Sequence, residues 1–188
     1  MNRRRPTLCL TLLLLAAAIP ATATIVRALS IEQLTATADV IAEGTVTAQS
    51  SSWNDEKTRI YTVTTLAVLT AHKGPVKPGE TLQIRQIGGT VDGLTQSIVG
   101  NAKLSVGEEM LVFLDRDEGR GLHYVVGMAQ GKFSIDRASP TPRLDRPLQN
   151  LSTLDAKGSP VPLVTPGAAP TVQALDGLRA RIRDAINR

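Results

Sequence analysis

The sequence is poor in three residue types that often carry chemistry, with one cysteine, two histidines and five aromatic residues among 188. The cysteine, Cys9, lies in an N-terminal segment that we expect to be removed, so the mature chain would have no disulfide, thiol nucleophile or thiolate metal ligand. His72 is expected in a loop and His123 at the start of a strand. Neither has a carboxylate or a second histidine at a ligand spacing, which argues against zinc sites and histidine-based triads. We therefore predict no cofactor, no metal site and no catalytic residue.

Nucleic-acid binding is not indicated either. Sites for single strands combine stacking aromatic rings with a basic face. Phe113 and Phe133 lie in apolar runs typical of a core, which leaves Trp53 and Tyr61 as a thin platform. The 21 basic residues fall to 18, against 17 acidic ones, when the three arginines at residues 3–5 are removed with the N-terminal segment. Net charge then gives no reason to expect a nucleic acid or an anionic membrane as partner.

Residues 1–23 have the pattern of an export signal. Three arginines are followed by an apolar run over residues 8–19, and Pro20 precedes a small-x-small cleavage pattern that ends at Ala23. A membrane anchor is the alternative, but a spanning helix needs about 20 apolar residues and this run is shorter. We predict cleavage after Ala23 and an exported protein, periplasmic or secreted, with no membrane span after cleavage.

The centre of the mature chain is a meander over residues 104–135. Three short apolar runs, at residues 110–114, 122–126 and 133–135, are separated by clusters rich in glycine and aspartate. Runs of this length with such boundaries are typical of strands joined by tight turns. The uninterrupted run at 110–114 indicates a strand that is covered on both faces.

A short helix and three further strands are expected before the meander. Ser30 and Gln33 form the pattern of a capping box, and the apolar spacing after Ser30 indicates a helix of about two turns. Period-two alternation or enrichment in threonine and valine predicts strands over residues 40–49, 59–69 and 81–87, with a polar turn at 50–58 and a loop from His72 to Gly79.

Gly88, Gly89 and Gly93 bracket a short segment after the third of these strands. A hairpin whose glycines adopt positive φ is one interpretation, and a flexible lid over a site is the other; we favour the hairpin. Together with Trp53 and Tyr61, which flank the turn before the long strand, these glycines are the candidate binding residues.

The composition changes after Arg137. Residues 138–170 contain seven prolines among serine, threonine, glycine and alanine, which favours a linker or an irregular arm wrapped on the domain. Thr171 is expected to cap an amphipathic helix over residues 171–187. Docking of this helix on the domain is favoured over a membrane-surface or partner-binding role, because the helix is short and lacks aromatic anchors.

Several segments together resemble a family of exported bacterial proteins whose activity is uncharacterised. The resemblance covers about residues 30–136. It is carried by the stretches ADVIAEGTV at 38–46, SWND at 52–55, IYTV at 60–63, HKG at 72–74, GE at 79–80, IGG at 87–89, GEEMLVFL at 107–114 and VGMAQGKF at 126–133.

The order of elements is also similar to the netrin-like module of tissue inhibitors of metalloproteinases. This resemblance implies a small OB-like barrel, closed or partly open and antiparallel, with a short N-terminal and a C-terminal helix. Those inhibitors act through an N-terminal cysteine, whereas the mature chain here would begin at Thr24, so their inhibitory chemistry is not transferred.

We thus expect a mainly β protein with a signal peptide (1–23), an OB-like domain (24–137), an arm (138–170) and a helix (171–187). The favoured function is a non-enzymatic interaction domain for a protein or peptide of the cell envelope or medium. An inhibitor or accessory protein of an exported peptidase is the alternative. A hydrolase that uses carboxylates, such as Glu43 with Asp55 or Glu109, is a weaker third possibility.

Overall fold

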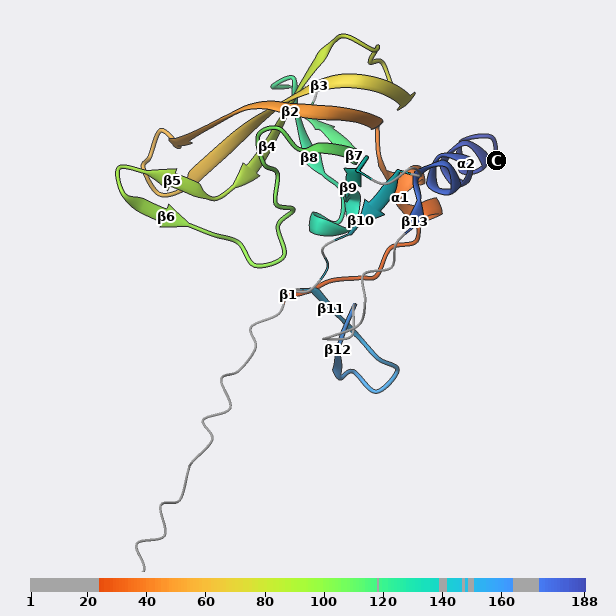
Figure 1. Cartoon of the computed structure of the whole chain (residues 1–188). Helices are drawn as coiled ribbons and strands as arrows, with labels where there is room; N and C mark the ends of the chain where they lie inside the picture. The colour runs from red at the N-terminus through yellow and green to blue at the C-terminus, as the bar shows by residue number, and fades with distance from the viewer. Residues whose placement is uncertain (1–23, 118, 139–141, 147, 149–150, 164–172) are drawn as a thin grey trace, which may run out of the picture.

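A computed structural model describes residues 24–117, 119–138, 142–146, 148, 151–163 and 173–188 (Figure 1). The predicted export signal and its cleavage site at Ala23 lie outside the described residues. The described elements, in chain order, are β1 (Thr24–Ile25), α1 (Ile31–Thr37), β2 (Val40–Trp53), β3 (Ile60–Lys73), β4 (Thr81–Ile87), β5 (Gly89–Val91), β6 (Leu94–Gln96), β7 (Glu109–Asp117), β8 (Leu122–Val125), the 3-10 helix η1 (Met128–Gly131), β9 (Lys132–Asp136), β10 (Arg143–Asp145), β11 (Leu151–Leu154), β12 (Pro160–Pro162), β13 (Gln173–Ala174) and α2 (Leu175–Ile186).

The main sheet is mixed and curls back toward itself. Its order is β13-β10-β9-β7-β2-β3-β4-β8, and β8 pairs a second time, with β7. The contact that would close the ring is slight, because β4 and β8 share one parallel residue pair, Ile84 with His123. The sheet is therefore partly ringed but is not a barrel. The mainly β architecture with a short N-terminal and a C-terminal helix is confirmed, whereas the antiparallel OB-like barrel is not.

The two longest strands, β2 and β3, carry this curvature. Their antiparallel register shifts between Ile41 and Ala42, between Glu43 and Gly44, and between Val46 and Ala48. Such irregularities bend a strand and increase its twist. Gly44 is required at one of them, because a Cβ there would lie 2.3 Å from the carbonyl oxygen of Ala67.

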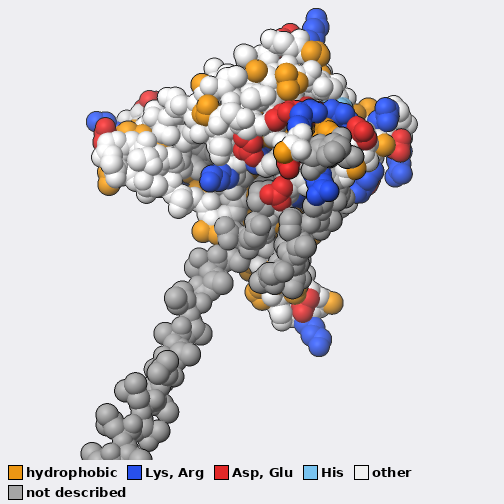
Figure 2. All heavy atoms as spheres, viewed as in Figure 1, with side chains coloured by type: hydrophobic (Ala, Val, Ile, Leu, Met, Phe, Trp, Pro, Cys, Tyr) orange, Lys and Arg blue, Asp and Glu red, His pale blue; other side chains and the backbone are white. Residues whose placement is uncertain are grey.

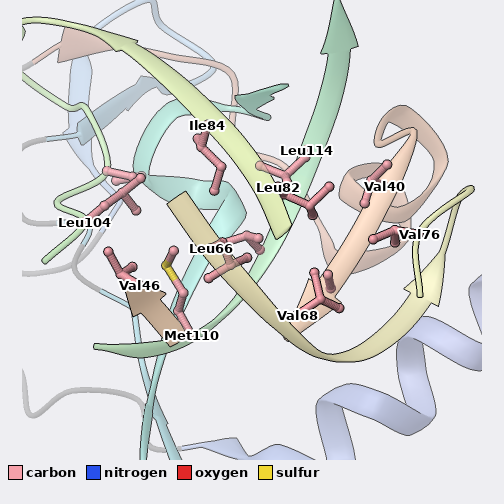
Figure 3. Close-up of a cluster of buried hydrophobic side chains, with 14 of the residues drawn as sticks. Val40, Val46, Leu66, Val68, Val76, Leu82, Ile84, Leu104, Met110 and Leu114 are labelled. Atoms are coloured by element: carbon pink, nitrogen blue, oxygen red, sulfur yellow. The ribbon is translucent and has the colours of Figure 1, made fainter. Parts of the chain in front are cut away.

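The curled sheet separates two hydrophobic cores. The first core lies on one face and is drawn in Figure 3; it includes Val46, Leu66, Val68, Ile84 and Met110. The second core lies between the other face and the two helices, and includes Leu34, Ile41, Phe113, Phe133 and Leu178.

Strand β7 belongs to both cores. Met110, Val112 and Leu114 pack in the first core, whereas Leu111 and Phe113 pack in the second, and all five are fully buried. The prediction of a strand covered on both faces is confirmed, as is the burial of Phe113 and Phe133.

The N-terminal helix also forms as predicted. The Ser30 side chain accepts a hydrogen bond from the backbone of Gln33, and the Gln33 side chain accepts one from the backbone of Ser30, which completes the capping box. Two boundaries differ from the expectation. Strand β2 runs on to Trp53, and β3 runs on to Lys73, so His72 lies in a strand and not in a loop.

Much of the described chain after Arg137 packs on the main sheet, whereas β11 and β12 form a separate small sheet with β1 (Figure 1). Leu144, Leu148 and Leu151 are buried, and β10 pairs with β9. Helix α2 docks beside α1, with Leu178 and Ile182 fully buried (Figure 1). It begins at Leu175 without a side-chain cap, and the predicted cap Thr171 lies outside the described residues.

Candidate functional site

A groove of about 490 Å³ opens where β2, β3 and β4 meet the base of the β5–β6 hairpin and the loop at residues 97–104. We call it the polar groove. Amide and hydroxyl side chains and two glycines form much of its lining: Gln49, Ser51, Thr62, Gln86, Gly88, Gly89, Thr90, Gln96, Ser97 and Asn101. Ile87, Ile98, Ala102 and Leu104 add apolar surface.

The hairpin interpretation of the glycine segment is confirmed. Val91 pairs with Leu94 across a two-residue turn in which Asp92 and Gly93 have φ of 51° and 77°. Positive φ at both positions is the type I′ arrangement that matches the twist of paired strands. The hairpin projects from the body of the protein, at the opposite end from α2 (Figure 1).

The base of the hairpin lies close against the side chains of β2 and β3 at one side of the groove. Gly89 has φ of 136°, and a Cβ there would lie 2.4 Å from Thr62 Oγ1 and 2.5 Å from Ser51 Oγ. Only glycine lets the backbone pass this close over the two hydroxyl side chains. Thr62 Oγ1 also donates to the carbonyl oxygen of Gly88 at 2.7 Å, which ties the hairpin base to β3.

Three amide side chains hold the loop that forms the other wall. Asn101 Nδ2 donates to the carbonyl oxygen of Ile87 at 2.8 Å, and Gln86 Nε2 donates to that of Ala102 at 3.0 Å. Gln49 Nε2 donates to the carbonyl oxygen of Leu104 at 2.6 Å. In each case the amide nitrogen is the donor, and no described residue donates to the amide oxygen of Gln49, Gln86 or Asn101. These oxygens can therefore accept hydrogen bonds from a ligand.

The groove is almost uncharged, with Lys103 as the one ionisable residue in its lining. Figure 2 shows the same contrast at larger scale: charged side chains gather toward the helical end, whereas the surface around the hairpin is mostly uncharged. Side chains of this chemistry can form hydrogen bonds with neutral polar groups. It holds no pair of groups for general acid and base catalysis.

The structure brings together some of the predicted binding residues and separates others. Gly88 and Gly89 line the polar groove, and Gly93 lies at the tip of the hairpin. Trp53 is half-buried and pairs with Ile60 at the end of β2. Tyr61 does not line the groove; the guanidinium of Arg85 lies 3.7 Å from the centre of its ring.

A second notable site is a buried ion cluster formed by Glu43 of β2, His72 of β3 and Arg179 of α2. Arg179 donates from Nε to Glu43 Oε1 at 2.7 Å and from Nη2 to Oε2 at 2.6 Å, while His72 Nε2 lies 2.8 Å from Oε1. Glu43 is 1 % exposed. Burial raises the pKa of Glu43, but the hydrogen bonds from Arg179 and His72 outweigh it and hold the pKa at about 2.

This cluster bears on the carboxylate-enzyme hypothesis. With its lowered pKa, Glu43 has no proton to donate near neutral pH, and both of its oxygens are engaged. Asp55 is exposed in the β2–β3 turn, and Glu109 accepts hydrogen bonds from Arg137 at 2.7 and 2.9 Å. The raised pKa values that such an enzyme needs are therefore not present at Glu43.

Neither the ion cluster nor the role of the three groove amides was predicted from the sequence. Arg179 lies 136 residues from Glu43, and Gln49 lies 55 residues from Leu104. No local pattern joins residues that far apart.

Comparisons with protein-family models, curated proteins and solved structures found no match. Among the described residues, no helix has the length and apolar character needed to cross a membrane. Within the same part of the chain, histidine, cysteine and carboxylate side chains form no group of three that could hold a metal ion.

Proposed function

We propose that the protein is an exported, non-enzymatic interaction domain that binds an extended segment of a protein or peptide in the polar groove. The observation that carries the proposal is the lining itself, which offers amides and hydroxyls with a single ionisable residue. A peptide backbone presents one donor and one acceptor per residue, and amide side chains can satisfy both. The volume of about 490 Å³ lies in the range of ligand pockets.

The test is capture of partners from the cell envelope and culture fluid by the chain from residue 24 to residue 188. Ser97→Trp places a bulky ring on an exposed groove residue, and Ser159→Trp makes the same change at an exposed serine in the β11–β12 turn. We expect the wild type and Ser159→Trp to capture the same partner, and Ser97→Trp to lose it. Equal capture by both variants would reject the groove as the site.

Export is part of the proposal. Thr24, which would be the first residue after cleavage, donates from Oγ1 to the carbonyl oxygen of Val99 at 2.6 Å. Cleavage after Ala23 would therefore leave every described element intact. N-terminal sequencing of the protein recovered outside the cytoplasm should begin at Thr24. Retention of residues 1–23 would contradict the proposed processing.

Inhibition of an exported peptidase is the second candidate, and the β5–β6 hairpin favours it. The hairpin projects, and Leu94 beside its turn is 60 % exposed, which suits insertion into a cleft (Figure 1). The proposal also retains the OB-like, netrin-like plan as a hypothesis, supported by strand order and flanking helices. If the wild-type protein slows cleavage of a substrate by a peptidase and Leu94→Asp does not, inhibition is supported. If the wild-type protein has no effect on several classes of peptidase, inhibition is rejected.

A further inference from the structure

Strand β3 has a free edge at its C-terminal end. It pairs with β2 along its whole length, but β4 covers only Tyr61 to Ala67 on the other side. The backbone N–H of Val68 donates to the carbonyl oxygen of Glu80, and that of Gly79 donates to the carbonyl oxygen of Val68, which extends this cover to Val68. Beyond Val68, no described strand pairs with this edge of residues 69–73. An uncovered edge offers a row of backbone donors and acceptors to another chain.

The free edge borders a cleft of about 560 Å³ between β3 and α2, which we call the α2 cleft. Thr70, Ala71 and His72 form its strand side. Ile182, Arg183 and Ile186 are prominent on the helix side. Ile186 is 41 % exposed, so an apolar surface lies open beside the edge.

The lining of the α2 cleft contains one guanidinium that is not offset by a carboxylate of the described residues. The lining includes Arg179 and Arg183 and no carboxylate. Arg179 is engaged by Glu43 and Asp176, whereas Arg183 is exposed and forms no ion pair with any described residue. A free guanidinium at the rim of a strand edge favours a partner that carries carboxylates.

We propose that the α2 cleft is a second docking site, for an extended acidic segment of a partner polypeptide that adds a strand to β3. Its backbone would pair with residues 69–73, an apolar side chain would contact Ile186, and a carboxylate would pair with Arg183. Strand addition obtains affinity from the backbone and specificity from alternate side chains, and both features are available here. The site is independent of the polar groove, which lies at the other end of β3.

The test is selection of eight-residue random peptides displayed on phage against the immobilised protein. We expect the selected peptides to alternate apolar with polar residues and to carry net negative charge. A synthetic peptide of the selected sequence should bind Arg183→Glu at least tenfold more weakly. Binding to Arg59→Glu, a charge reversal at an exposed arginine of the β2–β3 turn, should change less than twofold.

Two further measurements separate strand addition from other modes. N-methylation of alternate peptide amides should abolish binding, because it removes the donors that pair with the strand edge. Amide chemical shifts should change over residues 69–73, and Ser97→Trp should bind normally. The proposal is overturned if no peptide is selected, if binding is insensitive to Arg183→Glu or to N-methylation, or if Ser97→Trp removes it. The last result would assign the peptide to the polar groove.

Discussion

At the scale of single residues, Glu43 is the most deeply buried ionisable side chain among the described residues. It is buried, and its charge is balanced by side chains from β3 and α2. Removing one partner of a buried ion pair leaves the other uncompensated. We expect Glu43→Ala to lower the free energy of unfolding by about 3–5 kcal/mol, measured by urea denaturation. Glu56→Ala, at an exposed residue of the β2–β3 turn, is the control and should change it by less than about 0.5 kcal/mol. Similar losses in both variants would contradict the role of the ion cluster.

The same residue predicts how stability depends on pH. The pKa of Glu43 is about 2 in the folded protein, against an ordinary value of 4.5. A carboxylate whose pKa is lowered on folding stabilises the folded protein at pH values above its ordinary pKa. This stabilisation is lost as the pH falls from 4.5 toward 2. The difference in unfolding free energy between the wild type and Glu43→Gln should therefore be full at pH 6 and shrink between pH 4.5 and 2.

Denaturation at pH 6, 4 and 2.5 measures this difference. Glu32, whose pKa a hydrogen bond from Arg181 also lowers to about 2, is present in both proteins and cancels. A difference that stayed constant over this range would contradict the lowered pKa of Glu43.

At the scale of elements, local patterns identified most of the fold. The capping box located α1, and an uninterrupted apolar run located β7, because both signals lie within a few residues of chain. The end of β3 was misplaced, since Gly74 and Pro75 favour a loop while pairing with β2 extends the strand to Lys73. The curvature of the sheet could not be predicted from local sequence patterns, because it depends on register shifts between β2 and β3.

The candidate site divides in the same way. Gly88 and Gly89 were predictable, because positive φ in a hairpin is a local demand of the backbone. The amides of Gln49, Gln86 and Asn101 were not, because their role arises only when the loop at residues 97–104 folds back on the sheet. The groove therefore combines a hairpin that local sequence predicts with a loop whose position depends on tertiary contacts.

Helix α2 provides a prediction at the same scale. It buries Leu178 and Ile182 against the second core and supplies Arg179 to Glu43. A chain that ends at Arg137 would expose Ile41 and Phe113 and leave Glu43 without its guanidinium. We expect this truncated chain to lose cooperative thermal unfolding, followed by circular dichroism. A sharp transition close to that of the full chain would show that the segment after Arg137 is dispensable for folding.

At the scale of the whole molecule, the partly ringed sheet positions the two proposed binding sites. The polar groove is lined by Thr62 near the start of β3, and the α2 cleft is lined by Thr70, Ala71 and His72 near its end. The β5–β6 hairpin and α2 lie at opposite ends of the molecule (Figure 1). The long strand joins them through the first core, which contains Leu66 and Val68. Two partners could therefore bind at once without sharing contacts.

The slight closure of the ring leads to a prediction about the order of local unfolding. Strand β7 is buried on both faces, whereas β8 meets β4 through one residue pair, and β12 is exposed. Exchange of backbone amides with deuterium follows the free energy of local opening. We expect β12 to exchange first, β8 next, and residues 110–114 of β7 last, measured by mass spectrometry of peptides. In a closed barrel, β8 would be held equally on both sides and would exchange together with β7. Matching exchange of β7 and β8 would therefore indicate that the ring is closed in solution, and a clear lag of β7 behind β8 would support the open arrangement.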